Sequence, residues 1–385
     1  MAINKEQNKL NVPHLRFPEF HGEWCISTIG EQFNLYSGNT PSRLNKEHFE
    51  GNVNWITSGE LKEHYISDTK EKISEDAATA NNLKLLHPGT FVIAIYGLEA
   101  DGVRGTGSIT CKESTISQAC MAFTQKGDVK NEFLYSWYKK HGNIIGIKYA
   151  QGTKQQNLSY DILEKFHIAY PSQDEQDKLI KFISLLDERI ATQSKLIEKL
   201  ESLIKGIAQH CIRELINGWE YVRLSDICKI TTGKLDANAQ VENGQYPFFT
   251  CAEQPFNIDS YAFNTEALLI SGNGANLGYI NYYKGKFNAY QRTYVLNYFS
   301  VNIQYVKWAL KVLLPKRIAI EKSSSNTPYI VLSTLADLKI PLPNNSKQNH
   351  IANLMQSFER KLSNQLALND LYNKQKQYML RQMFI

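Results

Sequence analysis

The sequence predicts an α+β fold in which two β-rich domains form a tandem pseudo-twofold repeat, separated by two long helices that form an antiparallel coiled coil. Three observations lead to this architecture. Short β-rich apolar runs recur in the same order in both halves of the 385-residue chain, each half ends in a strand that stops at proline, and a long segment with helical periodicity follows each proline. A chain of this length also exceeds the size of one typical core.

The repeat begins at two tryptophans. The segment from Trp24 to Gly38 aligns without a gap, at an offset of 195, with the segment from Trp219 to Gly233. Each segment reads as a tryptophan, a short strand, a helical turn and a glycine loop. Because both tryptophans lead a strand at matching positions of the repeat, we expect them to be core anchors.

Three further pairs of segments follow in the same order. The members of each pair share strand-like apolar patterns, and the last pair ends in proline. The pairs are 88–97 with 265–274, 117–123 with 290–296, and 166–172 with 338–344. Four matches in one order indicate a duplication rather than coincidence.

The helix that follows the first proline carries a heptad pattern. Its seam residues recur at alternating spacings of four and three over more than four heptads, which predicts a coiled coil rather than an ordinary amphipathic helix. Gln193 is the one polar residue of the seam. The seam consists of Leu179, Ile183, Leu186, Ile190, Gln193, Ile197, Leu200, Ile204, Ile207 and Cys211.

An offset of 172 transfers this seam to the second helix and places Gln193 on Gln365. The apolar part of the second seam is Ile351, Met355, Phe358 and Leu362. Beyond Gln365 the same phase continues through Asn369, Tyr372, Lys376, Met379 and Met383, where the seam weakens. A shift in phase onto Leu366, Leu368 and Leu371 is the alternative continuation. A helix of about 40 residues is about 60 Å long, so we expect the two helices to pack on each other within the chain. A rod that joins two chains is the alternative.

This organisation predicts five segments. They are an N-terminal extension at 1–21, a first β-rich domain at 22–171, a central helical spacer at 172–214, a second β-rich domain at 215–343 and a C-terminal helical spacer at 344–385. A protein with twofold symmetry can read two DNA half-sites at a fixed separation. Because the two domains differ in sequence, their half-sites should differ too.

Composition adds weaker indications. The net charge is +5, so any basic surface for DNA must be local. The six cysteines form no CxxC pair, which predicts buried thiols in a reducing compartment rather than disulfides or metal ligands. The N-terminus lacks the apolar core of a signal peptide, and the apolar runs are strand-sized. We therefore expect a soluble, cytoplasmic protein without a bound metal.

The motifs of several enzyme classes are missing. An adenine methyltransferase needs an Asn/Asp-Pro-Pro-aromatic loop, and the chain has no Pro-Pro pair. It also has no triphosphate-binding G-x-x-x-x-G-K-[ST] loop and no convincing acid and lysine cluster for a nuclease. The glycine-rich stretch 272–278 should open a helix if it bound a dinucleotide. The residues that follow instead predict a strand, a Lys-Gly turn and another strand, so a glycine loop at a sheet edge and a non-catalytic chain are expected.

Four segments of the chain, 12–24, 52–61, 151–163 and 271–296, carry a resemblance to a known family. They are similar to recurrent blocks of the specificity subunits of Type I restriction-modification systems, and the chain resembles these subunits over nearly its whole length. The resemblance implies two target recognition domains, each of which reads half of a bipartite site in double-stranded DNA. It also implies that the two helical spacers set the gap and dock two modification (methyltransferase) subunits.

The resemblance further implies a division of chemistry among partners. The modification subunits would bind S-adenosylmethionine and methylate adenine, and the restriction subunits would use ATP and Mg to translocate and cleave DNA. This chain would bind no cofactor itself. Two alternatives stay open: the recognition subunit of a Type IIB-like restriction enzyme, and a coiled-coil adaptor that binds no DNA.

Polar side chains in the loops that bound the strands are the candidate DNA contacts. Arg and Lys suit guanine, Asn and Gln suit adenine, Glu accepts from cytosine, and Lys and Ser hold phosphate. In the first domain the candidates are Ser37, Asn39, Thr40, Ser58, Glu60, Arg104, Thr106, Lys154, Gln155 and Gln156. In the second they are Thr232, Lys234, Asn273, Asn276, Lys284, Lys286, Gln291, Arg292, Ser324, Asn326 and Thr327. The alternative is that these loops are polar only because water surrounds them.

Overall fold

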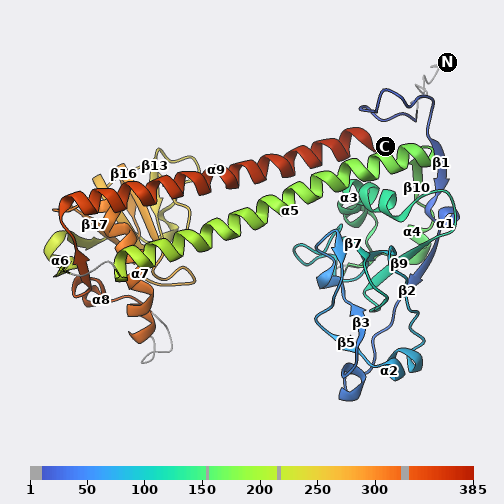
Figure 1. The fold of residues 1–385 in the computed structure, drawn as a ribbon, viewed down its shortest axis with the longest axis horizontal. Helices are drawn as coiled ribbons and strands as arrows, with labels where there is room; N and C mark the ends of the chain where they lie inside the picture. Colours follow the sequence, from blue (N-terminus) through green and yellow to red (C-terminus); the bar gives the residue numbers. More distant parts are fainter. Residues whose placement is uncertain (1–10, 153–155, 215–217, 322–328) are drawn as a thin grey trace. The chain divides into compact units, whose positions relative to one another are not determined.

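The computed structural model of the chain divides into two compact units (Figure 1). The first unit contains the residues up to 194 together with 368–385, and the second contains 195–367. Each of the two long helices therefore contributes one part to each unit. The structure describes residues 11–152, 156–214, 218–321 and 329–385.

Three groups of paired strands make up the β-rich part of the first unit. One sheet has the order β2-β9-β6-β7-β4, a second has the order β5-β3-β8, and β1 pairs with β10. The strands are β1 (Cys25–Thr28), β2 (Phe33–Ser37), β3 (Val53–Ile56), β4 (Tyr65–Ile66), β5 (Lys72–Ile73), β6 (Phe91–Ala94), β7 (Gly107–Thr110), β8 (Ser114–Ile116), β9 (Cys120–Gln125) and β10 (His167–Tyr170).

Short helices and turns connect these strands, and one longer helix packs on them. The helices are α1 (Ile29–Gln32), α2 (Glu75–Ala80), α3 (Asn131–Tyr149) and α4 (Tyr160–Leu163), with 3-10 turns η1 (Lys46–Phe49) and η2 (Ser58–Glu60). A capping box starts α1: Glu31 N–H donates to Thr28 Oγ1 at 3.2 Å, and Thr28 N–H donates to the Glu31 carboxylate at 2.9 Å. The same position of the repeat carries Asp226, which accepts the N–H of Arg223 at 3.3 Å.

The second unit has a larger sheet in the order β12-β17-β15-β16-β13-β14, and β11 pairs with β18. Its strands are β11 (Glu220–Arg223), β12 (Lys229–Thr232), β13 (Tyr246–Phe249), β14 (Phe256–Ile258), β15 (Phe263–Ser271), β16 (Ile280–Ala289), β17 (Thr293–Asn297) and β18 (Lys339–Leu342). Its shorter helices are α6 (Leu224–Ile227), α7 (Ile303–Glu321) and α8 (Leu332–Ala336), and η4 (Ala237–Ala239) is a 3-10 turn.

The tandem duplication predicted from the sequence is confirmed. The order β1-α1-β2 recurs as β11-α6-β12, and the strand neighbours β2-β9-β6 recur as β12-β17-β15. Later in each half, α3, α4 and β10 correspond to α7, α8 and β18. In both halves the first strand pairs antiparallel with the last, which brings the start of each domain beside the long helix that follows it.

A buried glutamine closes each repeat at the start of its long helix. Gln176 is fully buried; its amide donates to Pro171 O at 3.1 Å and its carbonyl accepts the N–H of Lys130 at 3.0 Å. At an offset of 172, Gln348 donates to Pro343 O at 2.8 Å and accepts the N–H of Asn302 at 3.1 Å. Because each glutamine satisfies otherwise unpaired backbone groups, it fixes the helix start against the domain.

The long helices are α5 (Gln173–Gln209), which continues into a π-helical turn at His210–Glu214, and α9 (Asn345–Met383). They run antiparallel in both units. In the first unit, Leu179 and Ile183 share a buried cluster with Leu380 and Met383. The polar positions of this stretch are paired as well, since Lys376 contacts Asp187.

In the second unit, the buried cluster combines Leu200 and Ile204 of α5 with Ile351 and Met355 of α9, and Phe358 and Leu362 pack against it. Of the remaining seam positions, Gln193 and Ile197 are buried, and Leu186, Ile190, Ile207 and Gln365 are half-buried. Of the three leucines of the shifted phase, Leu366 and Leu371 are exposed and Leu368 is half-buried, so the seam does not move onto all three.

Polar residues of the original phase stay at the contact between α9 and α5. Leu366 and Leu371 are 47% and 59% exposed, whereas Tyr372 and Lys376 of the original phase are half-buried. Tyr372 accepts a hydrogen bond from Arg189 at 2.8 Å, and Lys376 pairs with Asp187. Partners on α5 thus compensate the burial of these polar side chains.

The tryptophans that open the repeats lie in or beside the two main cores. Trp24 is 3% exposed and packs edge-on against Phe133 at a ring distance of 5.8 Å. Trp219 is half-buried and packs against the core of the second unit. Both are therefore anchors of the β-rich domains, although Trp219 is less deeply buried than expected.

Two expectations from the sequence were wrong. The Lys-Gly turn predicted after Tyr283 does not exist, because β16 runs unbroken through Lys284 and Lys286 and pairs with β15 along that length. Gly285 between them has φ 139°, a conformation that glycine adopts readily, so the strand passes through it without a turn. The cysteines are not uniformly buried: Cys25 and Cys111 are exposed, and Cys251 is half-buried.

Membrane insertion through a helix finds no support. Within the described residues, no helix combines the length and apolarity needed to cross a bilayer.

Candidate nucleic-acid interface

In each unit the backbone passes very close to another strand just after the second strand of the domain, which is β2 in the first unit and β12 in the second. Gly38 follows β2 and Gly233 follows β12. A Cβ atom on Gly38 would lie 1.8 Å from Ile116 O, and one on Gly233 would lie 1.9 Å from Ala289 O. Only glycine allows such an approach. In both units the loop after this strand therefore passes directly over the end of another strand.

In the first unit, three segments meet beside this crossing. Ile95 N–H donates to Ala119 O at 2.9 Å, and Leu158 N–H donates to Ile95 O at 2.9 Å. The segment before β9, the segment after β6 and the segment before α4 are thus joined by backbone hydrogen bonds.

The second unit repeats this junction with different residues. Gly272 N–H donates to Arg292 O at 2.8 Å, and Ile330 N–H donates to Gly272 O at 2.8 Å. The backbone frame is the same in both units, while the side chains it carries differ. Such a frame fixes the backbone of the loops that meet at the junction, while the side chains of those loops can differ between the two units.

In the second unit the junction borders a cleft of about 250 Å³. It is lined by Thr232, Gly272, Gln291, Arg292, Tyr294 and Ile330. The structure therefore brings together three of the candidate DNA contacts, which come from the end of β12 and from the tight turn before β17. Within the described part of the chain, the guanidinium of Arg292 is exposed and makes no hydrogen bond or ion pair.

Neighbouring groups hold two side chains of this cleft in place. Gln291 donates its amide to Asp236 Oδ1 at 2.7 Å. Tyr294 donates its hydroxyl to Ile330 O at 2.9 Å. Burial raises the pKa of Tyr294, so its hydroxyl remains a donor at neutral pH. The cleft thus combines two side chains held in fixed positions with the guanidinium of Arg292, which makes no hydrogen bond or ion pair within the described residues.

Asn273 and Asn276 both contact Cys251 in the loop after β13. Cys251 Sγ lies 3.0 Å from Asn273 Oδ1, and the Asn276 amide donates to Cys251 O at 3.1 Å. Both asparagines therefore bind the loop after β13 rather than point freely into solvent.

The lysines of the second unit lie in three separate places. Lys234 is exposed in the loop after Gly233. Lys284 and Lys286 lie on strand β16 instead of in a loop; Lys284 is opposite Glu266, and the ammonium of Lys286 is 4.7 Å from the centre of the Tyr261 ring. A cation held over an exposed aromatic ring remains accessible to phosphate.

Two candidates of the first unit are brought together. Arg104 donates to Gln156 Oε1 at 2.8 Å, and the N–H of Gln156 donates to Glu99 at 2.8 Å. That hydrogen bond lowers the pKa of the Glu99 carboxyl. Thr106 lies on the same loop as Arg104, but its hydroxyl donates a hydrogen bond to Val103 O at 2.7 Å.

The remaining candidates of the first unit mostly stabilise turns. Both oxygens of Glu60 are used: one accepts from Thr57 and the other accepts the N–H of Lys70 at 2.7 Å. Asn39 Oδ1 accepts the N–H of Thr40 at 2.8 Å. Ser37 is exposed at the end of β2, and Ser58 is half-buried at the start of η2.

Five candidates cannot be placed. Lys154, Gln155, Ser324, Asn326 and Thr327 lie outside the described residues.

The sequence analysis missed two acids that hold candidate residues in place. Asp236 holds Gln291, and Glu99 holds the backbone of Gln156. These partners are separated by 55 and 57 residues along the chain, so one sequence offers no local signal for either contact. Among the described residues no group of three or more His, Cys, Asp or Glu side chains is arranged to hold a metal ion.

Comparison with known proteins gives a family for this architecture. Residues 21–202 and 216–369 match the family model described as the Type I restriction modification DNA specificity domain. The chain belongs to this family.

Relatives with specificity-subunit names support this assignment. The EcoDI specificity subunit of Escherichia coli is 45% identical over 134 residues, which cover 35% of this chain and 30% of that subunit. The chain thus spans less than a third of the EcoDI subunit's length in this match. The MjaIX specificity subunit of Methanocaldococcus jannaschii is 24% identical over 387 residues and is covered to 88%, with 89% of this chain matched.

Two solved structures share the fold. The S subunit of a Type I restriction-modification system from M. genitalium superposes with a TM-score of 0.63 at 19% identity, covering 97% of this chain and 99% of that one. A chain from a structural study of assembly and conformational transition in the type I R-M system gives 0.60 at 16% identity, covering 93% and 96%. The two-domain, two-helix architecture is therefore the architecture of known specificity subunits.

Proposed function

We propose that this member of the specificity-domain family is the DNA-reading subunit of a Type I restriction-modification complex, and that each β-rich domain reads one half of a bipartite site in double-stranded DNA. The observation that carries the proposal is the duplicated junction beside Gly38 and Gly233. Because the same backbone frame presents different side chains in the two units, it suits two readers of two different half-sites. The domain limits 22–171 and 215–343 belong to the proposal.

In the second domain, the cleft lined by Thr232, Gln291 and Arg292 is the proposed reading site. Arg292 has an exposed guanidinium, which suits the O6 and N7 acceptors of guanine or a phosphate. Gln291 is held by Asp236, so its position is fixed before DNA binds. Lys234, Lys284 and Lys286 are proposed to contact phosphates.

In the first domain, the Arg104–Gln156 pair is the corresponding proposal. The carbonyl oxygen of Gln156 is engaged by Arg104, which leaves the amide N–H groups of Gln156 for an acceptor on a base edge. Glu60 and Asn39 are better explained as turn-forming residues, because their side chains are already hydrogen-bonded within the domain.

The two long helices are proposed to set the gap between the half-sites and to dock two modification subunits, which the restriction subunits then join. On this proposal the chain is non-catalytic and works in the cytoplasm. S-adenosylmethionine, ATP and Mg would be bound by the partner subunits. The missing methyltransferase and triphosphate motifs in the sequence support this division of labour.

The proposal is tested by reconstitution. The purified chain alone should show no DNA methylation, ATPase or nuclease activity. Addition of a modification subunit and methyl donor should give adenine methylation at one split sequence. Methyl transfer by the lone chain would contradict the proposal, and so would a reconstituted complex that methylates without sequence preference.

A further inference from the structure

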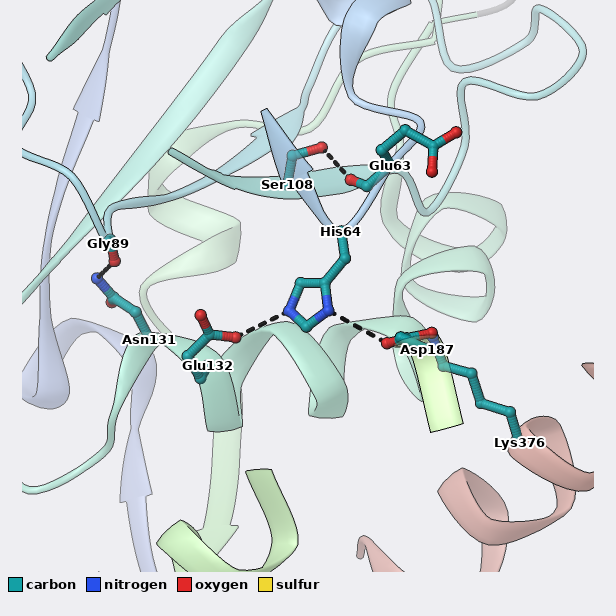
Figure 2. A network of polar contacts seen from close by, with 8 residues as sticks. All are labelled: Glu63, His64, Gly89, Ser108, Asn131, Glu132, Asp187 and Lys376. Carbon is teal, nitrogen blue, oxygen red and sulfur yellow. Dashed lines mark hydrogen bonds and ion pairs between the residues drawn. The ribbon is translucent and has the colours of Figure 1, made fainter. Parts of the chain in front are cut away.

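His64 lies between two carboxylates that come from two different helices. Its Nε2 is 2.8 Å from Glu132 Oε2 on α3, and its Nδ1 is 3.1 Å from Asp187 Oδ2 on α5 (Figure 2). The imidazole is sandwiched between the rings of Tyr65 and Tyr135, with centroid distances of 4.1 and 3.9 Å. The side chain of His64 is only 10% exposed, so water has little access to the ring.

This geometry selects one protonation state. A neutral imidazole has one N–H donor and one acceptor nitrogen, so it can donate to only one carboxylate. The second carboxylate would then face a nitrogen lone pair. An imidazolium has two N–H donors and satisfies both carboxylates, which makes the protonated form the one that fits.

The backbone and the neighbouring helices hold His64 where it is. Ile109 N–H donates to His64 O at 2.8 Å, and Ser108 Oγ donates to Glu63 O at 2.6 Å, so β7 fixes the segment before β4. On the other side, Lys376 of α9 contacts Asp187, as Figure 2 shows. His64 therefore connects the β-rich domain with both long helices inside the first unit.

The charged and titratable groups around the ring come from every element packed against it. They are Glu63, Tyr65, Glu132, Tyr135, Lys139, Asp187 and Lys376. With His64 protonated, Glu132 and Asp187 are balanced by His64 and Lys376. Burial raises the pKa of both tyrosines, which keeps them neutral. Burial and the nearby Lys376 lower the pKa of Lys139 to about 8, so Lys139 adds little compensation at alkaline pH.

The pKa of His64 follows from the same contacts. Burial alone would lower it, but the hydrogen bonds to Asp187 and Glu132 outweigh burial, and the net pKa lies above the ordinary value. Because folding raises the pKa of His64, the protonated ring stabilises the folded state, and this stabilisation is fully present below the pKa of the unfolded state, about 6.5. The stabilisation is lost as pH rises through the higher folded pKa.

The second unit makes the equivalent connection without an imidazole. Glu359 on α9 occupies the position of Asp187 at an offset of 172. It binds Lys307 Nζ at 2.7 Å and Lys311 Nζ at 3.2 Å, both on α7. Burial lowers the pKa of Lys307 from the ordinary lysine value near 10.4, whereas the carboxylates raise the pKa of His64 from about 6.5. The two domains are thus attached to their helices by different cations, an imidazolium in the first unit and an ammonium in the second.

We propose that His64, as an imidazolium between Glu132 and Asp187, is a positioning residue that fixes the first β-rich domain on α5 and α9, so that reading of the first half-site weakens when His64 loses its proton. The inference rests on the proposed function for its DNA consequence. The attachment itself is a property of the chain alone. Reading of the second half-site should not share this pH dependence.

The first measurement is an NMR titration of the full chain with labelled histidine imidazoles between pH 5.5 and 9. The His64 signals are assigned by their absence in His64→Gln. The expected midpoint lies above that of an ordinary histidine, about 6.5. A His64 midpoint at or below about 6.5 would overturn the inference.

The second measurement is chemical unfolding at pH 6.0 and 8.5 of wild type, His64→Gln, Asp187→Asn and the double variant. Wild type should lose stability between the two pH values, by up to about tenfold in the unfolding equilibrium constant for each unit by which folding raises the pKa. The coupling between His64 and Asp187 should be present at pH 6.0 and lost at 8.5. His87→Gln should behave as wild type. Coupling that is equal at both pH values would refute the protonation-dependent attachment.

The third measurement uses the complex with the modification subunit and duplexes that carry the methylated split site with one or the other half replaced. Raising pH from 6.5 to 8.5 should reduce discrimination at the first half-site alone, and His64→Gln should show the reduced value at both pH values. Equal pH effects on both half-sites would overturn the positioning role. A chain that discriminates no duplex at any pH would refute the proposed function, whereas the NMR and unfolding results judge the attachment independently.

Discussion

Replacing Gly233 by alanine tests whether the close backbone approach beside the cleft holds the second β-rich domain in shape. The added Cβ would lie 1.9 Å from Ala289 O and 2.2 Å from Ala289 C. Since real Cβ contacts essentially never fall below 3.0 Å, the backbone must move by more than 1 Å. The neighbour is backbone within a paired strand, not the end of a flexible side chain, so little of the strain can be relieved.

The expected cost is that of overpacking a well-packed site, about 1–3 kcal/mol or more. At roughly 2–4 °C per kcal/mol for a unit of 150–250 residues, the transition of the second unit should fall by several degrees. The assay is chemical and thermal unfolding of the full chain. Gly38→Ala should cost a similar amount in the first unit, where the contact would be 1.8 Å from Ile116 O.

Gly206→Ala is the matched control. A Cβ on Gly206 would meet nothing within 4 Å, and the residue lies inside α5. Alanine in a helix interior is about 0.5–1 kcal/mol more favourable than glycine, so this variant should be more stable than wild type. If Gly233→Ala were as stable as wild type while Gly206→Ala behaved as expected, the backbone crossing would not be a constraint, and the shared frame would lose its physical basis.

Four further predictions concern the cleft, the domains and the helices. Arg292→Ala should weaken binding to the second half-site by about 1–3 kcal/mol in fluorescence anisotropy and leave the unfolding midpoint unchanged; equal loss with unrelated duplexes would indicate a phosphate contact instead. Exchange of residues 22–170 for those of a relative should change one methylated half-site, and a change in both would contradict separate readers. One heptad added to each long helix lengthens it by about 10.5 Å, so mapped methylation sites should show a wider gap or no activity; an active variant with the original gap would show that the helices are not the ruler. Met355→Ala should cost about 2–5 kcal/mol in denaturant titrations because Met355 is fully buried, whereas Leu366→Ala should be nearly neutral; equal costs would place Leu366 in the seam.

The duplication and the first helical seam were predictable because their signals are local and periodic. Trp24 and Trp219 mark the same position of two repeats, and the four-three spacing from Leu179 onward follows directly from helix geometry. The second seam was harder to predict because Tyr372 and Lys376 are polar. Their burial depends on Arg189 and Asp187, which lie more than 180 residues away along the chain.

The candidate site was less predictable than the fold. Residue type selected Arg292 and Gln291, which the structure places in one cleft, but it gave the same weight to Glu60 and Asn276, which the structure uses to hold turns and loops. A side chain that suits DNA equally suits a turn, and only the three-dimensional arrangement of its partners distinguishes the two. The unbroken course of β16 through Gly285 was missed for a related reason, because a lone glycine marks a turn in most contexts but can also continue a strand.

Within each half of the molecule, the residues that hold the β-rich domain on its long helix are different from the loop residues that are candidate DNA contacts. Gln176 and Gln348 satisfy the same backbone groups, and Asp187 and Glu359 occupy the same position on their helices and bind a cation from the preceding domain. These contacts decide how each domain is held, and they lie on the helix side of it. The junctions beside Gly38 and Gly233 hold the loops that carry the candidate contacts. Exchange of loop residues can therefore change what is read without altering how the domain is held, provided that the buried cation and its acid are retained.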